Sequence, residues 1–245
     1  MLIHRVARLP TSTLRGFSLL EVSIVMFILS IMLGGVLLSI SSTRELNNRT
    51  ETEALLEDVM DALYGFAQAT GRLPCPATAA SNGAEAPAGG GSCTQQFGFV
   101  PSATLGLSGS VNDDGLLLDG WNSPVRYTVT TSNGDAFTTA NGMRNTTMAN
   151  LTPDLRVCAD AACATVIADS LPVVLVSLGA DWATFDAADV DATENAGEQT
   201  IAGYSHGNDL DFVSADYIED SFDDLISWMS ASILYTRMIS AGQLP

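Results

Sequence analysis

The chain has 245 residues and is strongly acidic, with a formal net charge of -18 at pH 7. All ten of its basic residues are arginine, since the sequence contains no lysine. Such a chain repels a phosphate backbone, so we expect no nucleic acid among its partners. The length allows one long helix with one large globular domain, or two small domains.

An uncharged, mostly apolar segment lies near the N-terminus, in residues 22–43. As an α-helix it would span about 33 Å, which is enough to cross the hydrocarbon core of a bilayer. The short segment before it carries Arg5, Arg8 and Arg15. This charge bias predicts a cytoplasmic N-terminus, with the body of the protein on the other side of the membrane.

Glu21 is an acid placed at the very start of this segment. A charged residue beside a membrane segment is costly and usually marks function. A secretory signal peptide would be cut after its apolar run, here near Ser41 or Ser42, and an uncleaved anchor is the simpler alternative. Because neither explains the acid, we favour a junction before the run, at Gly16.

Residues 16–21 read Gly-Phe-Ser-Leu-Leu-Glu and resemble the leader junction of type IV prepilins and type II secretion pseudopilins. In that family a prepilin peptidase cuts after the glycine, and the new N-terminal residue is N-methylated. The resemblance implies cleavage between Gly16 and Phe17 and methylation of Phe17. It places Glu21 where the family keeps glutamate, and it extends over residues 15–70.

The resemblance also implies how subunits assemble. The carboxylate of Glu21 would pair with the free α-amine of Phe17 on the next subunit, a head-to-tail contact that builds a filament because it does not close. The implied partners are prepilin peptidase, other pilin or pseudopilin subunits, an inner-membrane assembly platform and membrane lipid. The implied location is a bacterial inner membrane, as a single-pass protein, and later the filament. The simpler alternative leaves Glu21 in the headgroup layer without a specific partner.

Four regions are predicted along the chain. They are a leader at 1–16, the transmembrane and assembly half of a helix at 17–43, its amphipathic half at 44–70, and an extracytoplasmic head at 71–245. Apolar residues recur at helical spacing through the amphipathic half, and Gly71 followed by Pro74 predicts the end of the helix near Thr70.

Within the head, residues 71–115 contain many turn-forming residues, and three later segments are predicted to be strands: 125–130, 155–158 and 172–178. The last is nearly all apolar and is expected to be central. A helix is predicted to start at 221–224 and to run to about Ser240, with its apolar stripe against the sheet. The expected fold is therefore α+β and pilin-like, with a long N-terminal helix packed on an antiparallel sheet and an additional C-terminal helix.

Four cysteines form two local sets, Cys75 with Cys93 and Cys158 with Cys163. On the non-cytoplasmic side of a membrane, an even number of cysteines at such spacings favours two disulfides. The second disulfide would staple a tight hairpin. Zinc ligation and buried reduced thiols are the alternatives, and the lack of nearby histidines weakens the case for zinc.

Aspartates in predicted loops provide the hard oxygen ligands that calcium prefers. One candidate set is Asp186, Asp189, Asp191 and Glu194, and the other is Asn112, Asp113, Asp114 and Asp119. Some major pseudopilins bind calcium in a C-terminal loop, but neither set matches the EF-hand pattern. We favour solvated acidic loops over a calcium site and expect no other cofactor.

No catalytic constellation stands out, and His206 is the one histidine after the leader. We therefore expect a structural protein and not an enzyme, with a head large enough to favour a minor pilin or minor pseudopilin. Two alternatives remain. One is a pilus-tip adhesin or calcium-dependent binding head that uses the acidic region 181–224. The other is a membrane-tethered enzyme with its active site around His206 or a buried acid pair.

Overall fold

The structure is a computed structural model, and it describes residues 17–183, 194–196, 198–200, 203–205, 210–217 and 222–245. Side chains are described for these residues except 33–42, 198–200 and 203–205. The chain divides into two compact units, residues 1–46 and 47–245, and the boundary falls within the first helix. The predicted leader lies outside the described residues.

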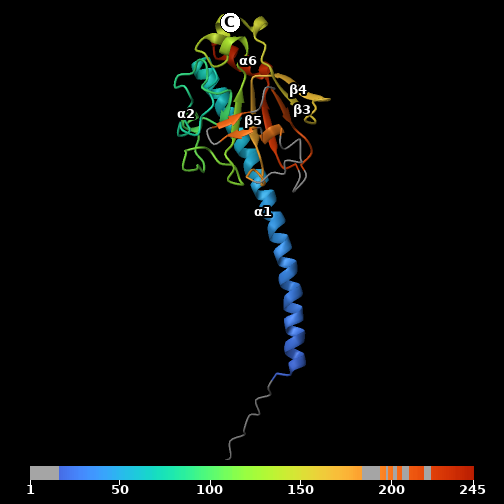
Figure 1. The fold of residues 1–245 in the computed structure, drawn as a ribbon. Coiled ribbons are helices and arrows are strands. Elements are labelled where there is room, and N and C mark those ends of the chain that lie inside the picture. The colour runs from blue at the N-terminus through green and yellow to red at the C-terminus, as the bar shows by residue number, and fades with distance from the viewer. Residues whose placement is uncertain (1–16, 184–193, 197, 201–202, 206–209, 218–221) are drawn as a thin grey trace, which may run out of the picture. The chain divides into compact units, whose positions relative to one another are not determined.

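Helix α1 runs from Leu19–Thr70 and contains 52 residues, as the sequence predicted (Figure 1). Gly71 ends it in a left-handed conformation, with φ of 77°, and its N–H donates to the carbonyl of Ala67. Among the residues that the structure describes, no helix is long and apolar enough to cross a membrane.

A four-stranded antiparallel sheet forms the centre of the second unit, in the order β1-β2-β5-β9. Its strands are β1 Phe97–Phe99, β2 Arg126–Val129, β5 Val173–Ser177 and β9 Leu225–Met229. The predicted strands at 125–130 and 172–178 are thus confirmed as β2 and β5. Every residue of β5 is buried, and this strand lies between β2 and β9, the central position expected from its composition.

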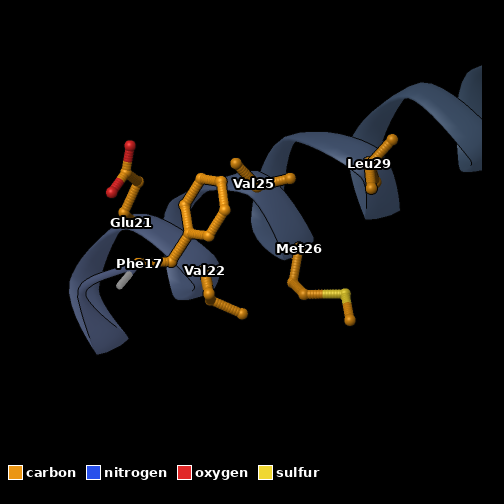
Figure 2. Close-up of a pocket in the computed structure, with 6 residues that line it drawn as sticks. All are labelled: Phe17, Glu21, Val22, Val25, Met26 and Leu29. Carbon is orange, nitrogen blue, oxygen red and sulfur yellow. The ribbon is translucent and has the colours of Figure 1, made fainter. Parts of the chain in front are cut away.

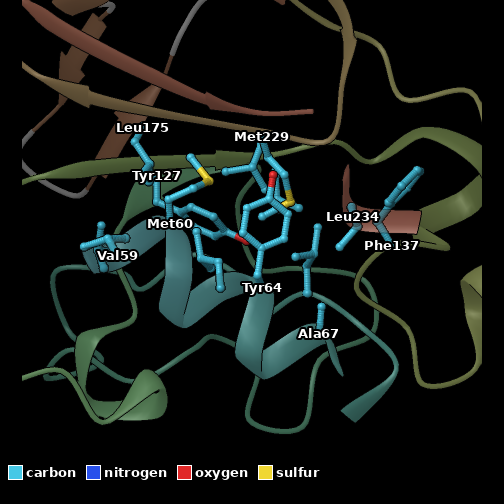
Figure 3. Close-up of a cluster of buried hydrophobic side chains, with 14 of the residues drawn as sticks. Val59, Met60, Tyr64, Ala67, Tyr127, Phe137, Leu175, Met229 and Leu234 are labelled. Carbon is cyan, nitrogen blue, oxygen red and sulfur yellow. The ribbon is translucent and has the colours of Figure 1, made fainter. Parts of the chain in front are cut away.

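The sheet has an apolar layer on each face because the side chains of a strand alternate in direction. Val173 and Leu175 of β5 belong to the core that also contains Leu63 and Tyr64 of α1. Figure 3 shows this layer, in which side chains of α1 meet side chains of the sheet. Val174 and Val176 of β5 face a second core on the other side. A strand covered on both faces needs the continuous apolar run that this segment has.

The second core is completed by a three-stranded sheet in the order β4-β3-β8. Its strands are β3 Leu155–Cys158, β4 Val166–Leu171 and β8 Asp211–Val213. Strand β3 was predicted at these residues and pairs antiparallel with β4 but parallel with β8, so this sheet is mixed. A two-stranded ribbon is formed by β6 Glu198–Thr200 and β7 Gly203–Ser205.

Short helices connect or flank these strands. They are α2 Ser102–Leu105, α3 Ser132–Asp135, α4 Gly142–Thr146, the 3-10 helix η1 Met148–Asn150, and the longer α6 Ala231–Ser240. Helix α6 lies against α1, since the guanidinium of Arg237 stacks 4.3 Å from the ring centre of Tyr64. Leu234 and Met238 of α6 are fully buried in the same core as α1.

The start of the C-terminal helix was predicted wrongly. The sequence placed it at 221–224, but residues 225–229 form β9, and α6 starts at Ala231. The spacing of Leu225, Trp228 and Met229 suits one face of a helix, yet these residues pair with the length of β5. Tertiary pairing with a buried strand overrides local periodicity here. The predicted α+β class, with a long N-terminal helix, an antiparallel sheet and a C-terminal helix, is confirmed.

Both disulfides are formed as the sequence favoured, and neither zinc ligation nor free thiols occurs at these cysteines. Cys75 and Cys93 have Cα atoms 5.3 Å apart and join the two ends of a long loop. Cys158 ends β3, and its partner Cys163 lies in the connection to β4, with Cα atoms 5.1 Å apart. The second disulfide therefore staples the β3–β4 hairpin.

Candidate assembly site on the N-terminal helix

Phe17 and Glu21 lie at the start of α1, within the first unit. The N–H of Leu20 donates to Oγ of Ser18 at 3.2 Å, and the N–H of Val22 donates to the carbonyl of Ser18 at 3.1 Å. Ser18 thus caps the helix directly after Phe17. Glu21 falls in the first helical turn, where the helix dipole favours a negative charge.

A shallow apolar hollow of about 320 Å³ follows these two residues along the helix. It is lined by Phe17, Glu21, Val22, Val25, Met26 and Leu29. Figure 2 shows the ring of Phe17 beside Glu21, and the four aliphatic side chains farther along. Glu21 supplies the charge of this otherwise apolar surface.

The side chains of residues 17–32 are not buried by any other part of the described chain. Every side chain from 17 to 32 is exposed, and Phe17 keeps 83% of its surface accessible. An apolar surface of this extent needs lipid or protein against it. The segment is therefore an interaction surface, and Glu21 is the one acid within residues 17–32 that a cationic partner group would meet there.

Residues 14–37 match the family model described as the prokaryotic N-terminal methylation motif. This motif covers 24 of the 245 residues and supports a type IV pilin-like protein. The motif implies processing by a prepilin peptidase and assembly with other pilins, and it suggests a membrane anchor. No curated protein and no solved structure was found to match it.

The first candidate calcium set is not placed by the structure as a group. Asp186, Asp189 and Asp191 lie outside the described residues, and so does His206. Glu194 is described and lies at the start of a short helical turn, half-buried. The hypotheses of a calcium loop at 186–194 and of an active site at His206 therefore stay predictions.

The structure describes the second candidate set, and two of its side chains accept hydrogen bonds from backbone N–H groups. Oδ1 of Asn112 accepts the N–H groups of Asp114 and Leu116, at 3.0 and 2.9 Å. Asp119 instead accepts the N–H groups of Trp121 and Ser123. These are the bonds of two separate turns.

Asp119 also accepts the hydroxyl of Ser177 at 2.5 Å. Among the described residues, one group of three acidic, cysteine or histidine side chains is close enough to hold a metal ion. It consists of Cys158, Cys163 and Asp211, and its two cysteines form a disulfide. The described carboxylates of the second calcium set thus do not gather into a metal site.

Sequence reasoning missed a set of buried carboxylates at one end of the sheet. Asp119, Asp223 and Asp224 are each at most 6% exposed. Burial raises the pKa of all three groups, and the pKa of Asp224 lies well above the ordinary range for aspartate. Asp223 and Asp224 directly precede β9, but this region contains many acids, so the sequence does not distinguish these two from the others.

Proposed function

We propose that this pilin-like protein is a structural subunit of a type IV pilus or type II secretion pseudopilus. In this proposal it is cleaved between Gly16 and Phe17, N-methylated at Phe17 and held in the bacterial inner membrane by residues 17–43. The N-terminus before cleavage is cytoplasmic, and the head is extracytoplasmic. The peptidase performs the chemistry, while the chain itself is structural and not catalytic.

The observation that carries the proposal is the placement of Glu21 on an exposed apolar helix, four residues after Phe17, within the matched motif. A carboxylate in such surroundings is stabilised by a cation and is costly without one. Cleavage before Phe17 would create a positively charged α-amine at the corresponding place on every subunit. An amine on one copy and a carboxylate on the next give a contact that repeats without closing.

We further propose that the chain is a minor subunit, placed at a filament tip or used in initiation. The support is the size of the head: the second unit holds two cores, two disulfides and two larger sheets. A bulk subunit needs only enough head to cover its own helix and to contact its neighbours. Quantifying the chain against other pilins in purified filaments tests this point, and a chain that makes up most of the filament would contradict it.

The mass of the N-terminal peptide, measured on protein purified from its host, tests the proposal. We expect a chain that begins at N-methylated Phe17, and an intact leader when the peptidase is deleted. Gly16→Ala should retain the leader. Glu21→Gln should be cut and methylated yet should fail to enter filaments, because the carboxylate that meets the amine is lost. A leader that stays intact whether or not the peptidase is present would overturn the proposal.

A further inference from the structure

Two segments that lie far apart in the sequence meet at one end of the four-stranded sheet. Residues 179–181 follow β5, and residues 223–224 directly precede β9, the strand that pairs with β5. Asp223 is buried, and its Oδ2 accepts the N–H of Ala180. We call the contact between these two segments the β5–β9 junction.

The carboxylate of Asp223 is tightly enclosed in this junction. Gly179 has φ of 62°, and a Cβ atom on it would lie 2.3 Å from Cγ of Asp223. The backbone after β5 is therefore packed directly on the carboxylate. No N–H group and no hydroxyl of the described chain reaches the buried Oδ1 of Asp223. A buried oxygen without a donor is costly, so this atom needs a partner.

The side chain that bonds this carboxylate is a second acid. The side chains of Asp181 and Asp223 are joined by a hydrogen bond. An ionised carboxyl group has no hydrogen to donate, whereas a protonated one has an O–H. Two carboxyl groups therefore bond each other only while at least one of them holds a proton. When both are ionised, the same contact places two negative charges together in a buried site, which is unfavourable.

Further acids face the junction and add to this requirement. Burial raises the pKa of Asp119, and the charge of Asp223 raises it further. Burial also raises the pKa of Asp224, and the charges of Asp223 and Asp181 add to that shift. The charge of Arg126 in β2 acts on Asp224 in the opposite direction. Among the described charged groups that act on these carboxyls, the acids thus outnumber the cation.

We propose that the β5–β9 junction is a proton-held latch, closed while Asp181 and Asp223 share a proton and open when both are ionised. Repulsion between the two charges then separates residues 179–181 from Asp223, while the pairing of β5 with β9 keeps the sheet intact. Burial raises the pKa of Asp223, so the latch is fully closed below the ordinary value for aspartate and opens as the pH rises through the raised value. This inference concerns the head alone and does not depend on assembly.

Trp182 directly follows Asp181 and can report on the latch. Its side chain is partly buried against the second core, so opening would expose the indole to water. The full chain in detergent, with Trp121→Phe and Trp228→Phe, keeps Trp182 as its one tryptophan. Its fluorescence emission and its quenching by acrylamide would be followed from about pH 4 to about pH 7. We expect the emission to shift to longer wavelength and the quenching to increase as the pH rises.

Hydrogen exchange of the unsubstituted chain gives a second measurement, which needs no change of tryptophan. The amides of Ala180 and Asp181 should exchange faster as the pH rises, after correction for the intrinsic exchange rate. The expected increase is roughly tenfold for each unit by which the pKa of Asp223 is raised. Asp223→Asn should stay closed at about pH 7, because its amide donates to Asp181 without a shared proton. Asp113→Asn, at an exposed position, is the control and should follow the parent.

Two results would contradict the role of the shared proton. One is a Trp182 emission and an exchange of both amides that do not change with pH. The other is an Asp223→Asn variant that opens over the same pH range as the parent. Opening that follows the removal of divalent cations at constant pH would also overturn the inference, because a bound cation and not a proton would then hold the junction.

Discussion

Gly120 lies directly against the backbone of Asn48 in α1. A Cβ atom on Gly120 would be 2.5 Å from the carbonyl oxygen of Asn48 and 2.8 Å from its Cα. The N–H of Gly120 donates to Oγ1 of Thr52 at 3.0 Å, and this hydroxyl donates to the carbonyl of Asn48 at 2.8 Å. The loop before β2 is therefore fixed on the helix by a close approach that only glycine allows.

We expect Gly120→Ala to destabilise the protein by about 1–3 kcal/mol, because the added methyl group meets backbone atoms that cannot move aside. Denaturant unfolding of the full chain in detergent measures the change. Gly65→Ala is the matched control, since the Cβ position of Gly65 has nothing within 4 Å and this residue lies inside α1. The control should be more stable than the parent by about 0.5–1 kcal/mol. Equal effects of the two substitutions would contradict this reading of Gly120.

The sequence predicted those features that depend on local pattern. Helix α1 has apolar residues at helical spacing and a glycine after its last turn, and β5 is an uninterrupted apolar run. The assembly role of Phe17 and Glu21 stays a prediction from the resemblance at residues 16–21. In contrast, β9 was taken for a helix because its pairing with β5 depends on residues 48 to 56 positions earlier in the chain, from Ser177 with Leu225 to Val173 with Met229.

The buried carboxylates were missed for the same reason. Asp224 is distinguished from the many solvated acids by its burial, which follows from tertiary packing.

Arg72 and Glu85 form a buried ion pair that organises the loop after α1. The two guanidinium nitrogens of Arg72 donate to the two carboxylate oxygens of Glu85, at 2.8 and 2.7 Å. The N–H groups of Cys75 and Gly89 donate to the same carboxylate. Burial alone would raise the pKa of Glu85, but the hydrogen bonds and charge of Arg72 hold it below the ordinary value.

We expect Glu85→Gln to cost about 3–5 kcal/mol, because it leaves the Arg72 cation buried without its counter-charge. The exposed pair of Arg49 and Glu53 provides the control, and Glu53→Gln should cost less than about 1 kcal/mol. Thermal unfolding of both variants beside the parent checks the difference. A loss below about 1 kcal/mol for Glu85→Gln would show that the pair contributes little.

The stability of the head should fall as the pH rises from mildly acidic to neutral values, in part because of Asp224. Burial raises the pKa of Asp224 well above the ordinary value for aspartate, and the charges of Asp223 and Asp181 raise it further. A raised pKa means that the folded state binds the proton more tightly than the unfolded state does. The contribution of Asp224 to stability is therefore fully present below its pKa in the unfolded state. This contribution is lost as the pH rises through the pKa of Asp224 in the folded state.

We expect Asp224→Asn to lose less stability than the parent between about pH 4 and pH 7, because the amide does not ionise. The side-chain amide of Asn195 donates to Asp224 at 2.8 Å, and an asparagine oxygen can accept the same bond. The melting temperature of each protein across this range gives the slope. Asp113→Asn, at an exposed position, is the control and should follow the parent. Parallel slopes for all three proteins would contradict the prediction.

The two disulfides should differ in what they contribute, because they close loops of different length. Cys75 and Cys93 are 18 residues apart, whereas Cys158 and Cys163 are 5 apart. On the chain-entropy account, their removal should cost about 3 and about 2 kcal/mol, respectively. The double serine variants of each pair, unfolded by denaturant under the same conditions, measure both losses. A larger loss for the pair in the β3–β4 hairpin would mean that the packing of the hairpin, and not loop length, decides the contribution.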